Sequence, residues 1–196
     1  GSDPAKDPLV HEKLGDPEKF IGIDLSRDGK HLFFYVSHGW NQTEIWHKNL
    51  AKNEKEWRPI VTGKPFKYSI EAWNDELYII TNEDAPRYRV MKTTTSKPEH
   101  KHWKEIIGEF DDGSVINAVQ VIGDHLVLTL MRDVQADLRI HDLNGKLVRD
   151  IELPGIGASF GMTGNPDDDT AYFGFQSFTM PHRIYETQVS TGKTSL

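Results

Sequence analysis

The feature that most constrains this sequence is a group of four short β-type runs that recurs four times along the chain. The most apolar run of each group begins near Lys30, Glu76, His125 and Thr170, so successive groups are 46, 49 and 45 residues apart. A period of about 40 to 50 residues with four strands per unit is typical of β-propeller blades. The sequence therefore predicts an all-β, partial propeller of about four consecutive four-stranded antiparallel blades.

Residue types within the runs favour strands over helices. The runs are rich in β-branched and aromatic residues and are separated by Gly, Asp, Asn and Pro. Asn144-Gly145 joins two of them, and this pair is typical of a type I′ hairpin turn. A β-sandwich would give evenly spaced strands without the four-fold grouping, so the propeller is preferred. The predicted blades span residues 20–63, 66–110, 114–154 and 158–196.

Charge and composition argue against several classes of partner. The 196 residues carry a net charge of −7 and no long run of Lys or Arg, which disfavours binding to nucleic acid. No apolar stretch approaches the roughly 20 residues of a membrane-spanning helix, so no membrane partner is expected. The lack of cysteine fits the cytoplasm, although a periplasmic location stays open.

Six segments of the chain, in order, resemble the propeller of the prolyl oligopeptidase family. They are FIGIDLSRDGKHLFFYVSHGWNQTEIW, DAPRYRV, WKEIIGE, LVLTLMRDVQADLRIHDLNG, IELPGIG and QSFTMPHRIYETQVSTGK. The resemblance runs from Asp7 to the end of the chain. The segment HGWNQ makes this chain more similar to bacterial and archaeal members of the family than to animal ones. It implies a seven-bladed propeller that caps an α/β-hydrolase domain. This chain resembles the end of blade 3 through blade 7.

The resemblance also implies a function. The family cleaves short peptides after proline, and its propeller gates access to a catalytic site in the hydrolase domain. Short proline-containing peptides and the missing hydrolase domain are therefore the expected partners in the intact enzyme. No serine is expected to act as a nucleophile here, because the sequence offers no strand-to-helix scaffold for a nucleophile elbow. We predict a non-catalytic fragment that lacks the Ser-Asp-His triad and is inactive alone.

Two aromatic residues are the predicted substrate-binding positions. Alignment on SRDGK implies that Phe20 and Trp40 line the pocket for the residues upstream of the substrate proline. Aromatic side chains suit such a wall because they offer a large apolar area at a small entropic cost. Ordinary core packing is the alternative for Phe20. Trp40 lies in the loop GWNQ, where the core explains an aromatic residue less readily.

No metal or cofactor is predicted from the remaining polar residues. His100 and His102 could share one face of a strand, but a zinc site needs further ligands. Asp167, Asp168 and Asp169 lack the spaced glycine and distal glutamate of a calcium loop. Both segments are interpreted as solvated loops.

The two ends of the chain suggest that it is part of a longer propeller. Gly1 and Ser2 are interpreted as a tag, and Leu9–Glu12 as the outer strand of a preceding blade, so that residues 1–19 precede the four blades. The chain is expected to stop inside its last blade. The exposed blade faces predict self-association of the fragment. The alternative hypothesis is a free-standing four-bladed propeller that acts as a protein- or peptide-binding module.

Overall fold

The computed structural model describes residues 3–196, so Gly1 and Ser2, interpreted above as a tag, lie outside the described residues. The strands are β1 (Lys19–Leu25), β2 (His31–His38), β3 (Gln42–Asn49), β4 (Arg58–Val61), β5 (Tyr68–Trp73), β6 (Glu76–Thr81), β7 (Arg89–Thr94), β8 (Lys104–Ile107), β9 (Val115–Ile122), β10 (His125–Arg132), β11 (Gln135–Asp142), β12 (Leu147–Ile151), β13 (Ala158–Gly164), β14 (Thr170–Gln176), β15 (Arg183–Gln188) and β16 (Thr194–Ser195). Two short 3₁₀ helices, η1 (Pro4–Lys6) and η2 (His100–His102), complete the described part. No helix within it is long and apolar enough to cross a membrane. The predicted all-β class is confirmed.

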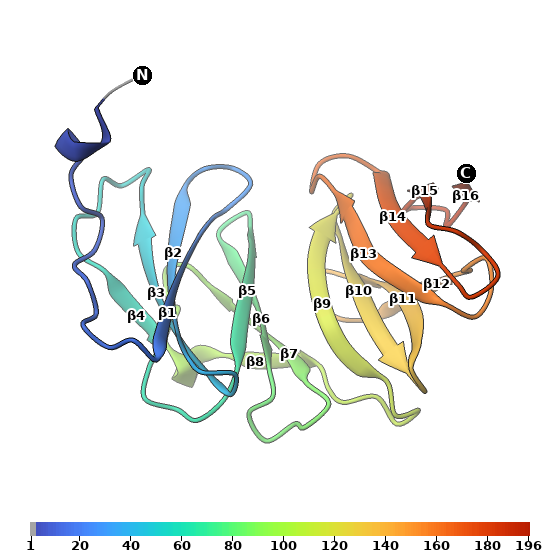
Figure 1. Cartoon of the computed structure of the whole chain (residues 1–196), viewed down its shortest axis with the longest axis horizontal. Helices are drawn as coiled ribbons and strands as arrows, with labels where there is room; N and C mark the ends of the chain where they lie inside the picture. The colour runs from blue at the N-terminus through green and yellow to red at the C-terminus, as the bar shows by residue number, and fades with distance from the viewer. Residues whose placement is uncertain (1–2) are drawn as a thin grey trace.

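The strands form four antiparallel sheets, each an up-and-down meander of four consecutive strands. We name them sheet A (β1–β4), sheet B (β5–β8), sheet C (β9–β12) and sheet D (β13–β16). The first strand of sheet C, β9, contacts the first strands of both neighbouring sheets, β5 and β13, so these three strands lie on the inner side of the array. Figure 1 shows the sheets following one another from the N-terminal to the C-terminal side. Over residues 3–196, sheets A and D do not pair, and the closed four-bladed ring of the alternative hypothesis is not formed.

Apolar side chains fill the three spaces between successive sheets. Buried representatives are Phe33 and Leu77 between sheets A and B, Tyr78 and Leu128 between sheets B and C, and Ile140 and Phe173 between sheets C and D. Successive residues of β6 alternate between the first two of these cores, because side chains of a strand point to opposite faces in turn. The continuous apolar run ELYIIT is thereby explained, since each of its faces packs against a different sheet.

The turn between β11 and β12 differs from the predicted type I′ hairpin. A type I′ turn needs positive φ at both central residues, but here Gly145 has a φ of 90° and Asn144 does not have a positive φ. The Gly145 N–H donates to the Asp142 carbonyl (3.0 Å), and the pairing register shifts at His141. The loop is therefore a turn followed by a glycine bulge. A Cβ on Gly145 would lie 2.1 Å from the Ile106 carbonyl oxygen, so only glycine fits between sheets B and C.

The segment before β1 does not form the strand predicted at Leu9–Glu12. Instead, the His11 ring stacks on Phe34 at 4.3 Å, and the Trp57 Nε1–H donates to the Val10 carbonyl at 3.4 Å. A strand needs a partner edge, and this segment lies across a face of sheet A rather than along an edge. Its assignment to a preceding blade stays a prediction.

Candidate functional site

Trp40 projects from the tip of the β2–β3 hairpin. The strands pair up to His38 and Gln42, which leaves Gly39, Trp40 and Asn41 as the loop. Gly39 opens the loop with a φ of 56°, a left-handed conformation that glycine adopts without strain. The Trp40 side chain is 89% exposed, so it has no part in the core. This exposure agrees with the prediction from the sequence that Trp40 does not belong to the core.

Phe20 lies close to Trp40 although 20 residues separate them in the sequence. It lies on β1 opposite Ser37 of β2, and it is 64% exposed, which argues against the core-packing alternative. Phe20 and Trp40 line one cleft of about 290 Å³. Its other lining residues are Ser37, Gly39, Gln42, Thr43 and Lys67. The structure thus brings the two predicted residues together.

Two further clefts adjoin this one at the same end of the sheets. One, of about 480 Å³, shares Phe20 and Gly39 with it, and the other, of about 300 Å³, shares Thr43 and Lys67. Together the three form what we call the hairpin-end groove, which extends from the start of β1 to the start of β9. The groove combines an aromatic wall with polar side chains, a mixture suited to an extended peptide.

Backbone hydrogen bonds fix the second wall of the groove. The Thr43 N–H of β3 donates to the Phe66 carbonyl (3.0 Å), which ties sheet A to the segment entering β5. The next residue, Lys67, donates its N–H to the Asn82 Oδ1 (2.8 Å). These bonds fix the backbone at Lys67, a residue that lines the groove.

The buried carboxylate of Glu83 binds Tyr68, a residue that lines the groove. The Tyr68 hydroxyl donates to the Glu83 Oε2 (3.0 Å), and the same carboxylate is bound by Lys64 and by the His100 Nε2 (2.8 Å). Burial opposes ionisation of Glu83, but these hydrogen bonds outweigh it and lower its pKa. Burial and the nearby carboxylate raise the pKa of Tyr68. The network therefore holds Tyr68 in place at the wall of the groove.

Lys67, Ser69 and Asn117 are among the polar residues of the groove that were not predicted from the sequence. They lie before or near the start of β5 and β9, as Phe20 lies near the start of β1. Because every first strand of a meander starts at the same end of a propeller, the residues at these starts must share one rim. The four-fold repeat in the sequence could therefore have predicted that these residues lie near Phe20.

The expectation that the sequence contains no Gly-x-Ser-x-Gly motif was wrong, because Gly157–Gly161 matches it with Ser159 at the centre. The structure places Ser159 within β13, paired with Phe175, and not at a strand-to-helix turn. Its Oγ is buried without a hydrogen-bond partner. Across residues 3–196, no serine side chain is hydrogen-bonded to a histidine side chain. The match is therefore no nucleophile elbow, since a nucleophilic serine needs an adjacent base.

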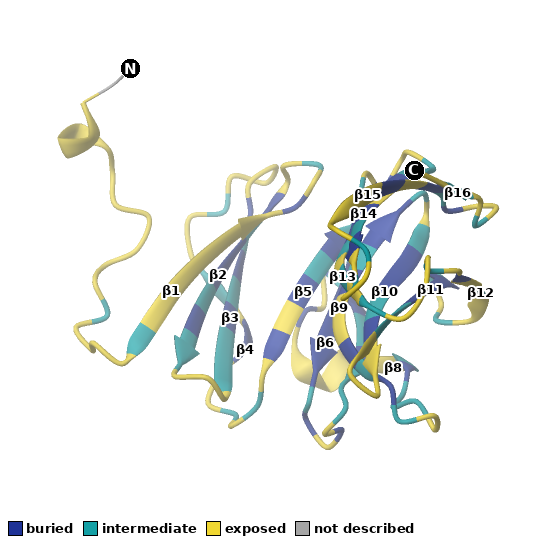
Figure 2. Ribbon diagram, turned by 45° about the vertical axis from the view of Figure 1, so that its right-hand side comes forward, coloured by how far each residue is buried: buried dark blue, intermediate teal, exposed yellow. Residues whose placement is uncertain are grey.

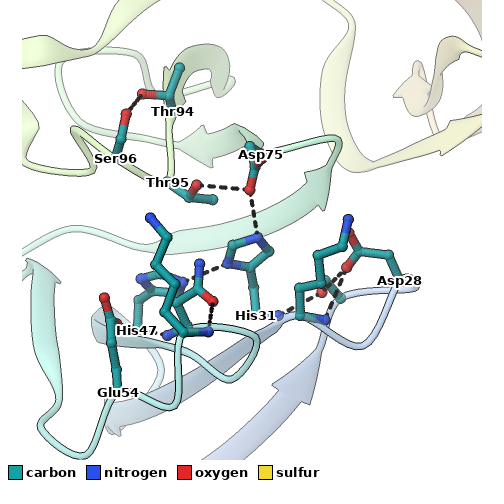
Figure 3. Close-up of polar contacts among 12 residues, drawn as sticks. Asp28, His31, His47, Glu54, Asp75, Thr94, Thr95 and Ser96 are labelled. Atoms are coloured by element: carbon teal, nitrogen blue, oxygen red, sulfur yellow. Dashed lines mark hydrogen bonds and ion pairs between the residues drawn. The ribbon is translucent and has the colours of Figure 1, made fainter.

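A second polar cluster joins sheets A and B away from the groove (Figure 3). His31 lies between two partners, with its Nδ1 2.9 Å from the His47 Nε2 and its Nε2 3.0 Å from the Asp75 Oδ1. If His31 donates to Asp75, its Nδ1 must accept from His47, and the buried His47 Nδ1 is then an unprotonated atom without a partner. Burial, with His31 adding to it, lowers the pKa of His47 to about 4. The cluster binds two sheets together, and within residues 3–196 its histidines line none of the principal clefts.

Comparison with known proteins agrees with this architecture. Residues 1–196 match the family described as the prolyl oligopeptidase N-terminal β-propeller domain. The chain is 31% identical to a prolyl endopeptidase of Elizabethkingia meningoseptica over 197 residues, which is 100% of this chain and 27% of that protein. It is 30% identical to prolyl oligopeptidase A of Amanita bisporigera over 162 residues, 76% of this chain and 21% of that protein. The chain thus spans about a quarter of the length of these relatives.

Solved structures give the same result. One of two prolyl endopeptidases studied for inter-domain dynamics superposes with a TM-score of 0.95 at 43% identity, over 100% of this chain and 28% of that chain. Prolyl oligopeptidase B of Galerina marginata, at 22% identity and a TM-score of 0.84, covers 97% of this chain and 28% of its own and supports the fold alone. The four-sheet array, the match over every residue and these likenesses together show that the chain belongs to the prolyl oligopeptidase N-terminal β-propeller family.

Proposed function

We propose that the chain is a non-catalytic propeller fragment of a prolyl oligopeptidase-type serine endopeptidase, which cleaves short peptides after proline. The observation that carries the proposal is the hairpin-end groove, where Phe20 and Trp40 form an exposed aromatic wall. In the intact enzyme this wall would contact the residue upstream of the substrate proline. Bond cleavage would be left to the α/β-hydrolase domain.

The apolar hairpin tips support docking of that hydrolase domain at the same end. Trp40 is 89% exposed on sheet A, Val134 is 90% exposed on sheet C, and Phe178 is fully exposed on sheet D. Val134 also has a φ of 64°, which is unfavourable for a β-branched residue and indicates a constrained tip. Exposed apolar groups that share one rim are typical of interaction surfaces.

The gating mechanism we propose consists of exclusion and positioning. A propeller that faces the catalytic domain admits only peptides small enough to pass it, and its aromatic wall holds them for attack. The blade boundaries at 20–63, 66–110, 114–154 and 158–196 belong to this proposal, as does the cytoplasmic location favoured by the cysteine-free sequence.

Kinetics of the full-length enzyme test the role of Trp40. We expect Trp40→Ala to raise KM for peptides with a bulky residue upstream of proline, with a loss of about 1 to 3 kcal/mol in transition-state binding, because one aromatic contact is removed. A minimal substrate should be almost unaffected. The matched control is Leu50→Ala, an exposed apolar residue between β3 and β4 and outside the groove. Equal effects of Trp40→Ala on both substrates would show that Trp40 is structural only.

A further inference from the structure

A cleft of about 480 Å³ opens at the outer strands of sheet B, outside the hairpin-end groove. It lies beside the end of β7 and reaches the β11–β12 turn of sheet C, so it spans two sheets. Lys92, Lys97 and Lys104 line it, together with the single carboxylate of Glu76. None of these residues takes part in the function proposed above.

The charge of this cleft is opposite to that of the protein. Three lysines against one glutamate give its lining a formal charge of +2, whereas the whole chain carries −7. His102 also lines the cleft, and its Nε2 lies 3.7 Å from the Glu99 carboxylate. A local excess of cations on an acidic protein attracts anions, because the nearby field dominates at distances below a Debye length of about 8 to 10 Å.

Two of the lysines have no counter-charge of their own. The Lys92 Nζ is 2.7 Å from the Glu76 carboxylate and donates to the Leu143 carbonyl at 3.0 Å. Within residues 3–196, by contrast, no carboxylate is in ion-pair contact with Lys97 or Lys104. Both of these residues are exposed and have their ammonium groups available to a ligand.

Pairing of the strands makes the excess of positive charge costly. Lys92 of β7 and Lys104 of β8 are direct cross-strand partners. Like charges directly opposite each other in a sheet destabilise it. The Glu76 carboxylate offsets the charge of Lys92, and an anion bound at Lys104 would offset the other charge of this pair. The partly buried Ile106 adds an apolar surface beside the charges, where the organic part of a ligand could pack.

We propose that this lysine cleft binds a small molecule that bears a multiply charged phosphate group. Two lysines without a counter-charge match the charge of about −1.5 to −2 that a phosphate monoester carries near pH 7, whereas a single carboxylate supplies only one negative charge. The shared chemistry is the phosphate group, which an inorganic or an organic phosphate supplies equally. Ile106 favours the organic source.

Calorimetric titration of the 196-residue chain tests the proposal, with inorganic pyrophosphate, phenyl phosphate and citrate as probes. We expect both phosphates to bind, to bind more weakly at higher salt, and to lose affinity at least about tenfold in Lys97→Gln/Lys104→Gln, because two charge-assisted contacts are removed. The matched control is Lys13→Gln/Lys193→Gln, which removes two lysines outside the cleft and should leave affinity unchanged. Because pyrophosphate carries the larger negative charge, tighter binding of phenyl phosphate would identify an organic phosphate as the ligand. Tighter binding of pyrophosphate would show that charge alone decides the affinity and would contradict the preference for an organic source.

Three results would overturn the proposal: no binding of either phosphate, citrate binding as tightly as pyrophosphate, or equal affinity in the cleft and control variants. Circular dichroism checks that each variant folds. NMR shift mapping on the unmodified chain gives an independent measurement, in which pyrophosphate should perturb the amides of Thr94, Lys97, Lys104 and Asn144. Perturbation confined to other regions would also contradict the lysine cleft.

Discussion

The inner and terminal sheets of this array use similar residues in different environments. On β6 of sheet B, every residue from Leu77 to Thr81 is buried. On β1 of sheet A, every residue from Phe20 to Leu25 is exposed, although FIGIDL is also largely apolar (Figure 2). Sheets B and C each face two cores, whereas sheets A and D each face one. Burial in a propeller is thus decided by the neighbouring sheet.

The two terminal sheets also differ from each other. On the outer face of sheet A, Phe34 is only 2% exposed, because His11, Trp46 and Trp57 pack around it. On the outer face of sheet D, Phe160, Tyr172 and Ile184 remain exposed. The segment before β1 therefore covers part of the first face, and over residues 3–196 no such segment covers the last.

The largest expected effect separates an inner sheet from a terminal one. Leu128→Ala on β10 should lower the free energy of unfolding by about 2 to 5 kcal/mol, because it leaves a cavity between sheets B and C. Ile184→Ala on the outer face of sheet D should change it by no more than about 0.5 kcal/mol, since its side chain is already exposed. Urea unfolding at protein concentrations low enough to keep the chain monomeric measures both. Similar losses for the two variants would mean that the outer face of sheet D is covered.

The second effect is a loss of stability in mild acid. Burial lowers the pKa of His47 on sheet A and of His141 on sheet C to about 4, from an ordinary 6.5. The unfolded chain therefore binds protons below pH 6.5 that the folded chain does not bind until about pH 4. Stability should be complete above pH 6.5 and fall between these values by up to about 3 kcal/mol per histidine.

Variants assign this pH dependence to a sheet. His47→Gln should remove the loss of stability in acid that arises between sheets A and B. His141→Gln should remove the loss that arises in sheet C. The exposed His102→Gln serves as the control and should leave the pH profile of unfolding unchanged. A profile that stays flat between pH 6.5 and 4 in the unmodified chain would contradict the burial of both imidazoles in neutral form.

The smallest effect concerns the uncovered face of sheet D. We propose that the chain self-associates through this face, and we expect Ile184→Glu to weaken association at least about tenfold by placing a charge in an apolar contact. Light scattering over a range of concentrations measures the mass, with Val10→Glu on the segment that covers sheet A as the comparison. A mass of 22.4 kDa that persists on concentration would rule out self-association.

Much of the fold was predictable because the strands obey local rules. The 46-, 49- and 45-residue spacing located all four sheets, since each blade is a complete local unit with short connections. The Asn144-Gly145 turn was predicted at the right place but with the wrong type, because the close approach of Ile106 was invisible in the sequence. Phe20 and Trp40 were singled out through family resemblance, while Lys67 and Asn117 needed the neighbouring sheets to be in place.

The sequence by itself determined the all-β class, the number of sheets and the apolar core strands, because strand alternation and turn residues act over a few neighbouring positions. Only the tertiary structure decided which apolar strands are buried, which aromatic residues share a groove, and which lysines lack a counter-charge. These properties depend on pairs such as Phe20 with Trp40, or Lys92 with Lys104, whose proximity arises from strand pairing and sheet packing rather than from adjacency in the chain.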